Sequence, residues 1–242
     1  MTDIAEISIF ENIIKEGKIH IQETNYFTKK GFSLKNIKKY SLGFLTDGLS
    51  KYSNIINEDK DILMCYKYII PYYFEKKLDY IIFRKCSITE KRLKIPFEIK
   101  KTYILGNKNK MWNYHYLFLL EENFLIFITE TWTDALSIEE IGYKAISLNG
   151  IDNIQEFWKI LKKVPSKKNG KFILICDNDI YGKKANSFLK NILENLGFEY
   201  LIYDNYPKNI KDCNEWLQFN KKLFKESMEN FIKDNKKNIY SK

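Results

Sequence analysis

From residue 124 onward, short apolar runs alternate with longer stretches in which apolar residues recur at helical spacing. A short apolar run is typical of a buried strand, and the longer pattern is typical of a helix. The expected strands are 124–129, 144–148, 171–176 and 199–203, and the expected helices are 133–141, 154–163 and 183–196. Because strands that alternate with helices form a parallel sheet, this part of the chain is predicted to be an α/β domain with a Rossmann-like, mostly parallel sheet.

The residues before 124 predict a different mixture of helices and strands. Apolar positions at helical spacing predict a helix over 4–17 that ends at Gly17, and Ser33 is a candidate N-cap for a second helix over 33–40. This part of the chain is therefore expected to be an α+β subdomain.

Two β-rich runs, 63–73 and 78–84, predict an antiparallel hairpin, in which Pro71 indicates an edge strand or a bulge. Residues 87–116 are polar and weakly periodic, which predicts a loop-rich segment with one or two short strands. We expect an N-terminal α+β subdomain, an α/β domain and a basic helical tail, over residues 1–121, 122–217 and 218–242.

The composition favours a folded protein with a polyanionic partner. The 242 residues are 45% hydrophobic and 16% aromatic, which is ample for a packed core. The 40 Lys and Arg against 31 Asp and Glu leave a net charge of +9, which favours nucleic acid or another anionic partner, although solubility alone would also explain it.

The four cysteines form no C-x-x-C pair and there are two histidines, so no structural zinc is expected. The N-terminus lacks the pattern of a signal peptide and no run is long enough to span a membrane, so we expect a cytoplasmic protein with reduced thiols.

Three acids follow two of the expected strands directly. Glu130 comes after the strand 124–129, and Asp177 and Asp179 come after the strand 171–176. Ligands of open α/β sheets bind outside the carboxyl ends of the strands, so these acids should converge there. Their oxygens suit Mg²⁺ or Mn²⁺ and phosphate chemistry.

A plainer interpretation of the same acids stays open. Asp179 can cap the helix that opens near Gly182, and the other two can be ordinary strand-end acids. An EF-hand is excluded, because Phe188 stands where the closing Glu is required. Asp134, one helical turn after Glu130, and Asp212, after the last strand, are further candidates for the metal site, with helix-dipole and capping roles as the alternatives.

Basic and polar side chains provide candidates for nucleotide and nucleic-acid binding. They are Arg84, Lys110, Asn113, Lys183 and Lys211. For a single lysine a solvated surface role is the default. Two aromatic clusters can stack single-stranded bases, although core packing is the more common role. Their members are Tyr66, Tyr68, Tyr72 and Tyr73, and Trp112, Tyr114 and Tyr116.

Three segments resemble the motifs of the Toprim domain of bacterial and phage primases. Residues 128–137 resemble the pattern in which Glu-Gly precedes an Asp-Ala-Leu helix, and residues 177–185 resemble the Asp-x-Asp-x-x-Gly-x-x-Ala segment. Residues 211–217 resemble the closing Lys-Asp-x-Asn-Asp/Glu segment, and residues 26–44 look like the start of the primase catalytic core. Two features depart from this pattern: Thr131 stands where the family usually has Gly, and no zinc-binding module precedes the core.

The resemblance implies a primase-like nucleotidyltransferase that makes short RNA primers from NTPs on a single-stranded DNA template, in a phage, a plasmid or another mobile element. Glu130, Asp177 and Asp179 would bind one or two Mg²⁺ that organise the triphosphate. A separate replicative helicase is an implied partner, because the chain after residue 217 leaves no room for a fused one. Two other functions stay open: a Toprim-type metal-dependent nuclease, and a catalytically silent replication protein that only binds nucleic acid.

Overall fold

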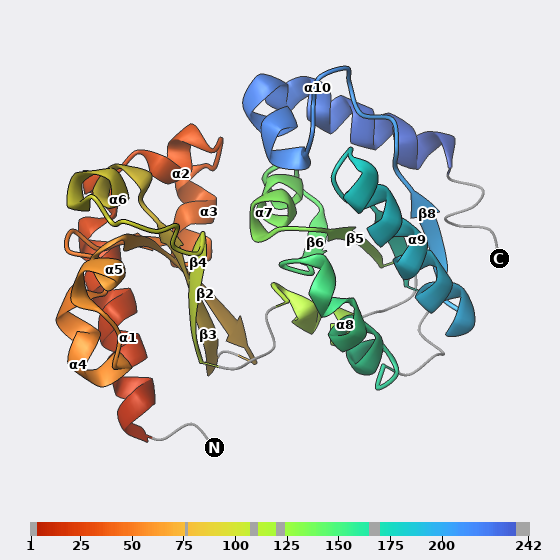
Figure 1. Cartoon of the computed structure of the whole chain (residues 1–242). Coiled ribbons are helices and arrows are strands. Elements are labelled where there is room, and N and C mark those ends of the chain that lie inside the picture. Colours follow the sequence, from red (N-terminus) through yellow and green to blue (C-terminus); the bar gives the residue numbers. More distant parts are fainter. Residues whose placement is uncertain (1–3, 76, 107–110, 120–123, 165–169, 236–242) are drawn as a thin grey trace. The chain divides into compact units, whose positions relative to one another are not determined.

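The computed structural model describes residues 4–75, 77–106, 111–119, 124–164 and 170–235, and it divides into two compact units (Figure 1). Unit 1 comprises Met1–Thr28 and Ser33–Lys108, and unit 2 comprises Lys29–Phe32 and Asn109–Lys242. This division falls after residue 108, before the expected boundary at 121. Its physical reason is that Trp112 pairs with Ser147 through two backbone hydrogen bonds of 2.9 and 3.0 Å, which join this segment to the second unit.

Unit 1 is an antiparallel sheet covered by short helices. Its elements are α1 (Ile4–Ile19), η1 (His20–Glu23), α2 (Tyr26–Lys29), α3 (Leu34–Lys39), β1 (Gly43–Phe44), η2 (Ser50–Tyr52), α4 (Ser53–Ile56), α5 (Lys60–Met64), β2 (Tyr66–Phe74), β3 (Lys77–Lys85), α6 (Ser87–Leu93) and β4 (Thr102–Gly106). The strand order is β1-β2-β3-β4, and all neighbours are antiparallel. The predicted hairpin is therefore confirmed as β2 and β3.

Two local predictions in unit 1 agree with the structure. Ser33 caps α3, because its hydroxyl accepts a hydrogen bond of 3.3 Å from the backbone N–H of Asn36. Pro71 lies beyond the part of β2 that pairs with β1, and the register of the hairpin shifts between Tyr72 and Tyr73. The missing N–H of the proline therefore costs no hydrogen bond to β1.

The predicted end of the first helix is wrong. Gly17 lies inside α1, which continues to Ile19. A Cβ atom at Gly17 would stand 2.3 Å from Cδ1 of Ile69, and one at Gly43 would stand 2.9 Å from the carbonyl carbon of Gly17. The glycine thus lets α1 approach β1 and β2 closely.

The sequence pattern also misassigned two short helices of unit 1. Leu63 and Met64 end α5, which Asp59 caps by accepting hydrogen bonds from two backbone N–H groups, so the strand begins three residues later than expected. Residues expected to form loops and short strands contain α6, in which Thr89 is buried, as well as the expected short strand β4. Helices this short show little periodicity, because they complete fewer than two turns.

Unit 2 is a four-stranded parallel sheet between two layers of helices. Its elements are η3 (Tyr114–Leu119), β5 (Leu125–Thr129), α7 (Trp132–Glu140), β6 (Lys144–Ser147), η4 (Ile151–Asn153), α8 (Ile154–Leu161), β7 (Lys171–Leu174), α9 (Ile180–Asn195), β8 (Glu199–Ile202) and α10 (Cys213–Asp234). The strand order is β6-β5-β7-β8, with every pair parallel. This confirms the predicted α/β fold.

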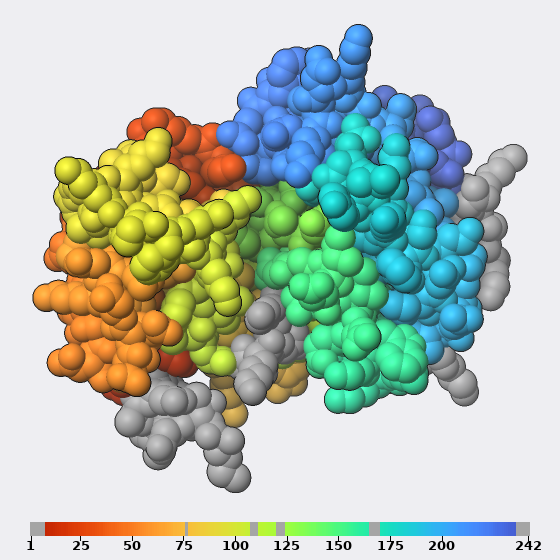
Figure 2. Space-filling view, in the orientation of Figure 1, coloured from red at the N-terminus to blue at the C-terminus, as the bar shows by residue number. Residues whose placement is uncertain are grey.

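The strand order decides which face each helix covers. The chain moves from β5 to β6 in one direction and from β7 to β8 in the other, and right-handed crossovers place the connecting helices on opposite faces. Accordingly α7 packs against α10, and α8 packs against α9. In Figure 2 the helices α8 and α9, coloured green and cyan, form one continuous surface.

Helix α10 belongs to the core of unit 2, although residues after 217 were expected to form a tail. The helix is kinked at Asn220, whose φ of −162° and ψ of 94° are not helical, and Oδ1 of Asn220 accepts a hydrogen bond from the N–H of Leu223. Beyond the kink, Phe224 is fully buried against Trp216, and Phe231 packs edge-on against Tyr203. None of the helices described is long and apolar enough to cross a membrane.

Candidate functional site

The acids Glu130 and Asp177 follow the two central strands of the parallel sheet. β5 and β7 are direct neighbours, with Ile128 opposite Leu174, and the chain leaves them toward opposite edges of the sheet. This is the topological switch point, at which open α/β sheets form a crevice outside the carboxyl ends of the strands. The structure thus brings Glu130, Asp177 and Asp179 together, as their strand positions predicted.

Glu130 is partly enclosed and lacks a partner for one of its oxygens. Its Oε2 atom is buried and accepts no hydrogen bond from any described residue. The pKa of Glu130 is raised to about 7, mainly by burial and in addition by the neighbouring carboxylates Asp177 and Asp179. A buried, unpartnered carboxylate oxygen is costly, so this atom is ready to accept a cation or a donor from a ligand.

Asp177 and Asp179 have different surroundings. The side chain of Asp177 is 11% exposed, and burial together with the charge of Asp212 raises its pKa to about 6. Asp179 caps α9: its Oδ1 atom accepts hydrogen bonds of 2.9 Å from the N–H groups of Tyr181 and Gly182. The bond from Gly182 is the main reason that the pKa of Asp179 is lowered. Asp179 therefore has the capping role that was the plainer interpretation, and its other oxygen remains at the site.

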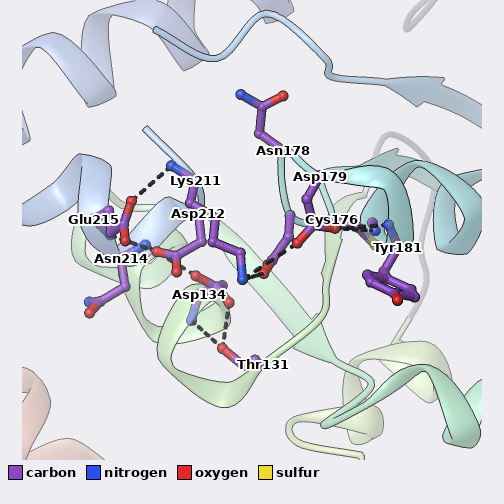
Figure 3. Close-up of polar contacts among 12 residues, drawn as sticks. Thr131, Asp134, Cys176, Asn178, Asp179, Tyr181, Lys211, Asp212, Asn214 and Glu215 are labelled. Carbon is purple, nitrogen blue, oxygen red and sulfur yellow. Dashed lines mark hydrogen bonds and ion pairs between the residues drawn. The ribbon is translucent and has the colours of Figure 1, made fainter. Parts of the chain in front are cut away.

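Lys211 joins the two aspartates. Its Nζ atom lies 3.4 Å from Oδ2 of Asp177 and 3.4 Å from Oδ2 of Asp179. Figure 3 shows Lys211 and Asp179 among the side chains at this edge of the sheet. The Asp177 carboxylate is the main cause of a raised pKa of Lys211. Of the basic side chains proposed from sequence, Lys211 is thus found in direct contact with the acids.

Gly182 explains the spacing of the Asp-x-Asp-x-x-Gly segment. A Cβ atom at Gly182 would lie 2.0 Å from the carbonyl oxygen of Asp177 and 2.7 Å from its carbonyl carbon and its nitrogen. The first turn of α9 therefore lies directly against the backbone of Asp177. Only glycine allows this approach, so it helps to fix the position of the carboxylate.

Asp134 is a structural residue in this fold. It is 2% exposed, its Oδ1 atom accepts a hydrogen bond of 3.1 Å from the N–H of Asn214, and its Oδ2 atom accepts one from the hydroxyl of Thr131. Burial raises its pKa well above the usual range. Both oxygens are thus engaged in joining α7 to the start of α10, and neither is offered to the crevice.

Asp212 is the N-cap of α10, because its Oδ1 atom accepts a hydrogen bond of 2.7 Å from the N–H of Glu215. Burial is the main cause of a raised pKa of Asp212, and its charge acts on Asp177.

Thr131 is the N-cap of α7, with φ −121° and ψ 158°. This is an ordinary extended conformation, so the turn does not require the glycine that the family usually has there.

The other candidate binding residues belong to other elements of the fold or lie outside the described residues. Lys183 is an exposed residue of α9, and Lys110 is not among the described residues. Arg84 is on β3 of unit 1, where it interacts with Tyr26. Asn113 is 2% exposed and donates hydrogen bonds of 3.3 Å to Oε1 of Glu139 and to the carbonyl of Ala145, so its observed role is to hold the fold together.

Most members of the two aromatic clusters are core residues, as the plainer interpretation expected. Those that are buried are Tyr66, Tyr72, Trp112, Tyr114 and Tyr116. Tyr68 is partly exposed and stacks on Tyr26, with ring centroids 3.9 Å apart.

Two residues of the site were missed by sequence reasoning. Asn178 donates hydrogen bonds from its backbone N–H to the carbonyl of Lys211, at 2.7 Å, and from its side chain to the carbonyl of Ile210, at 3.1 Å. Glu215 accepts a hydrogen bond of 2.8 Å from the backbone N–H of Lys211. Asn178 fills the variable position between two aspartates, and no local pattern distinguishes an asparagine there that binds a loop 32 residues away.

The donor set fits a hard divalent cation in its chemistry. Carboxylate oxygens are the ligands that Mg²⁺ and Mn²⁺ prefer, and Oε2 of Glu130 is buried without a partner. In the ranges that the structure describes, no group of three or more His, Cys, Asp or Glu side chains is arranged so that it could hold a metal ion. The acids are instead arranged around the ammonium of Lys211, so a metal would require their side chains to reorient.

A family model described as Toprim-like matches residues 127–217, from β5 to the first turns of α10. Residues 127–217 are therefore similar to Toprim-like domains. The curated relatives include an uncharacterized protein of Mycoplasma pneumoniae, the MG010 homolog, which is 26% identical over 196 residues, or 79% of this chain and 80% of that protein. The acids of the site therefore lie within the Toprim-like domain.

Solved primases have the same fold over most of the chain. The zinc-binding and RNA polymerase domains of the Aquifex aeolicus primase match with a TM-score of 0.65 at 14% identity, covering 93% of this chain and 59% of that chain. A DnaG primase catalytic domain bound to single-stranded DNA matches with a TM-score of 0.59 at 14% identity, covering 93% and 80%. The primase fragment of the bacteriophage T7 primase-helicase protein matches with a TM-score of 0.57 at 17% identity, covering 84% and 72%. At these identities the similarity establishes the fold alone, which this chain shares with these primase domains.

The raised pKa of Glu130 predicts that the metal-free protein loses stability as the pH rises. The folded state binds the proton of Glu130 more tightly than the unfolded chain does, so this contribution is complete below pH 4.5 and is lost as the pH rises to about 7. Between pH 5 and pH 8 the loss should be about 2 kcal/mol. Urea unfolding with a chelator present measures it. Glu130→Gln should make the loss of stability between pH 5 and pH 8 smaller, and part of the loss should remain because the pKa of Asp177 is also raised, to about 6. The control Glu226→Gln changes an exposed glutamate of α10 and should keep the dependence; an unchanged slope in Glu130→Gln would contradict the prediction.

Replacing Asp134 should destabilise unit 2. Asp134→Ala leaves the N–H of Asn214 buried without its acceptor, so the free energy of unfolding should fall by about 2 kcal/mol. Thermal unfolding tests this, with Asp152→Ala as the control, because Asp152 is exposed in the same unit and its replacement should change stability by less than about 0.5 kcal/mol. If Asp134→Ala and Asp152→Ala changed the free energy of unfolding equally, the hydrogen bond from Asn214 to Asp134 would contribute nothing to stability.

Proposed function

We propose that the protein is a DNA primase-like nucleotidyltransferase, which joins nucleotides into short RNA primers on single-stranded DNA. The observation that carries the proposal is the meeting of Glu130, with its unpartnered buried oxygen, and Asp177 at the switch point of the Toprim-like sheet. The fold that 93% of the chain shares with a solved primase supports it. The net charge of +9 also supports it, because the product and the template are both polyanions.

The residues have distinct roles in this proposal. Glu130 and Asp177 present carboxylate oxygens for Mg²⁺ or Mn²⁺, which when bound would neutralise charge on the triphosphate. Asp179 stays ionised because the first turn of α9 donates two hydrogen bonds to it. Asp134 holds the start of α10 in place and thereby positions Lys211 and Asp212.

Binding of nucleotides and template is assigned to basic side chains. Lys211 lies at the acids, Lys183 is exposed on the helix that Asp179 caps, and Arg84 carries a guanidinium suited to phosphate. Lys110 and Asn113 remain predictions, the latter without support from its observed contacts. A replicative helicase as partner and a place in the cytoplasm are further parts of the proposal. One of the solved neighbours is a primase-helicase protein.

An incorporation assay tests the function. The full chain is incubated with single-stranded DNA, labelled NTPs or dNTPs, and Mg²⁺, Mn²⁺ or a chelator. Short products that need the metal and the template, and that vanish in the double variant Asp177→Ala with Asp179→Ala, are expected. Metal-dependent degradation of the template would overturn the proposal in favour of a nuclease, and DNA binding without either reaction would leave a silent binding protein.

A further inference from the structure

Lys211 occupies the position between carboxylates that a cation would be expected to fill. Its Nζ atom is 3.4 Å from one oxygen of Asp177 and 3.4 Å from one oxygen of Asp179. Strong charge-assisted hydrogen bonds between such groups are shorter, about 2.7–2.9 Å. The ammonium is therefore held by the charge of both acids and closely bound by neither.

The backbone of Lys211 is fixed by hydrogen bonds, whereas its side chain is held, among the described residues, only by the two long ion pairs. Its carbonyl accepts a hydrogen bond from the N–H of Asn178, and its own N–H donates to Oε2 of Glu215. Asn178 also binds the carbonyl of Ile210, so the turn that carries the aspartates and the loop that carries Lys211 are joined at two points. The side chain, in contrast, is 54% exposed and has a flexible stem of four carbons.

The single positive charge of the Lys211 ammonium neutralises only part of the negative charge around it. The carboxylates of Asp177, Asp179 and Asp212 all act on the site, and Oε2 of Glu130 still has no partner among the described residues. A divalent cation would neutralise more of this charge than Lys211 does, and it would bind oxygens that the ammonium leaves unbound. The two cations would compete for the same oxygens of the aspartates.

We propose that Lys211 competes with the divalent cation for Asp177 and Asp179, and that the arriving nucleotide releases it to bind the triphosphate. The inference rests on the metal site of the proposed function and adds a regulation of it. The consequence is that a metal without nucleotide binds weakly, whereas a metal that arrives with a triphosphate offers the ammonium new anionic partners. Lys211 thereby favours loading of the metal and the nucleotide together.

The test measures two affinities in the full chain, native and Lys211→Met. Free Mn²⁺ is titrated without nucleotide and followed by its electron paramagnetic resonance signal, and the binding of ATP is then measured at saturating Mn²⁺. Lys211→Met should bind Mn²⁺ about tenfold more tightly and ATP about tenfold more weakly, because the competitor is lost together with a phosphate partner. A residue that only supports the loop would weaken both affinities when it is replaced.

Two control variants test whether the change in affinity results from loss of the positive charge at position 211 or from loss of any lysine in this loop. Lys211→Arg keeps a cation between the aspartates and should bind Mn²⁺ within threefold of the native chain. Lys208→Met removes an exposed lysine of the same loop that forms no ion pair with the described residues, and it should change neither affinity. Thermal unfolding in chelator verifies that each variant is folded.

The outcomes separate this inference from the proposed function. Unchanged or weaker Mn²⁺ binding by Lys211→Met overturns the competition and leaves the proposed metal site intact. Tighter Mn²⁺ binding in Lys208→Met as well would overturn it too, because the effect would then be one of net charge. If neither the native chain nor any variant binds Mn²⁺, both the inference and the metal site of the proposed function are wrong.

Discussion

Asp177→Asn should lower template-dependent nucleotide incorporation about a thousand-fold. The substitution keeps the size of the side chain and removes the charge that lies at the switch point of the sheet, 11% exposed and facing Lys211. Because burial raises the pKa of Asp177 to about 6, the charged form is disfavoured by the fold at pH 8. The variant should therefore be at least as stable as the native chain at pH 8, so lost activity would not result from unfolding.

The matched control for this substitution is Asp152→Asn. Asp152 is an exposed aspartate of η4 in the same unit, and its replacement should leave the rate of incorporation within twofold of the native rate. Rates are measured at pH 8 with saturating Mg²⁺ and compared with unfolding free energies from urea titrations. If Asp177→Asn retained more than a tenth of the activity, the carboxylate of Asp177 would not be part of the catalytic site.

Gly182→Ala should reduce the free energy of unfolding by about 3 kcal/mol and also impair the site. The added methyl group would lie 2.0 Å from the carbonyl oxygen of Asp177, and backbone atoms cannot rotate away as a flexible side chain can. Either α9 or the turn at Asp177 must shift, which would displace the carboxylates from Lys211. We expect nucleotide incorporation to fall at least tenfold in the protein that remains folded.

Gly197→Ala is the matched control, because it tests the cost of placing alanine at a glycine position where the added methyl group meets no other atom. Gly197 follows the same helix, has a φ of +72°, and has no atom within 4 Å of the position of an added Cβ. Its replacement should cost about 1 kcal/mol from the left-handed conformation alone, without loss of activity. Urea unfolding and the incorporation assay measure both variants, and equal costs would show that the approach of α9 to Asp177 is not tight.

The parallel sheet and the meeting of the acids could be predicted because both depend on local patterns and general topology. Each strand of unit 2 is a short apolar run, and parallel strands place their carboxyl ends at one edge. The contacts of individual side chains could not be predicted, because they join residues that are distant in sequence. Asp134 has the spacing of a residue that faces the crevice, yet its oxygens are bound by Thr131 and by Asn214, 80 residues away in sequence.

Gly17 and Asn113 also show that residue type alone does not predict the role of a residue. At Gly17 the sequence offers the usual signal for the end of a helix, and the helix continues because the residue is required for a close contact with Ile69 and Gly43. Asn113 was read as a polar partner for nucleotides, and its amide is used inside the fold. A residue type is compatible with several roles. Which role it has depends on packing contacts that a single sequence does not reveal.

The short segment Lys29–Phe32 makes the Toprim-like unit discontinuous in the chain. It lies within the sequence of unit 1, yet the carbonyl of Lys30 accepts a hydrogen bond from Asn214, Gly31 packs on Leu217, and Phe32 packs on Trp132. A fragment that starts at residue 109 would lose these contacts and expose the start of α10. Unit 2 therefore cannot be excised, fused or exchanged at a single junction without leaving part of its own core behind.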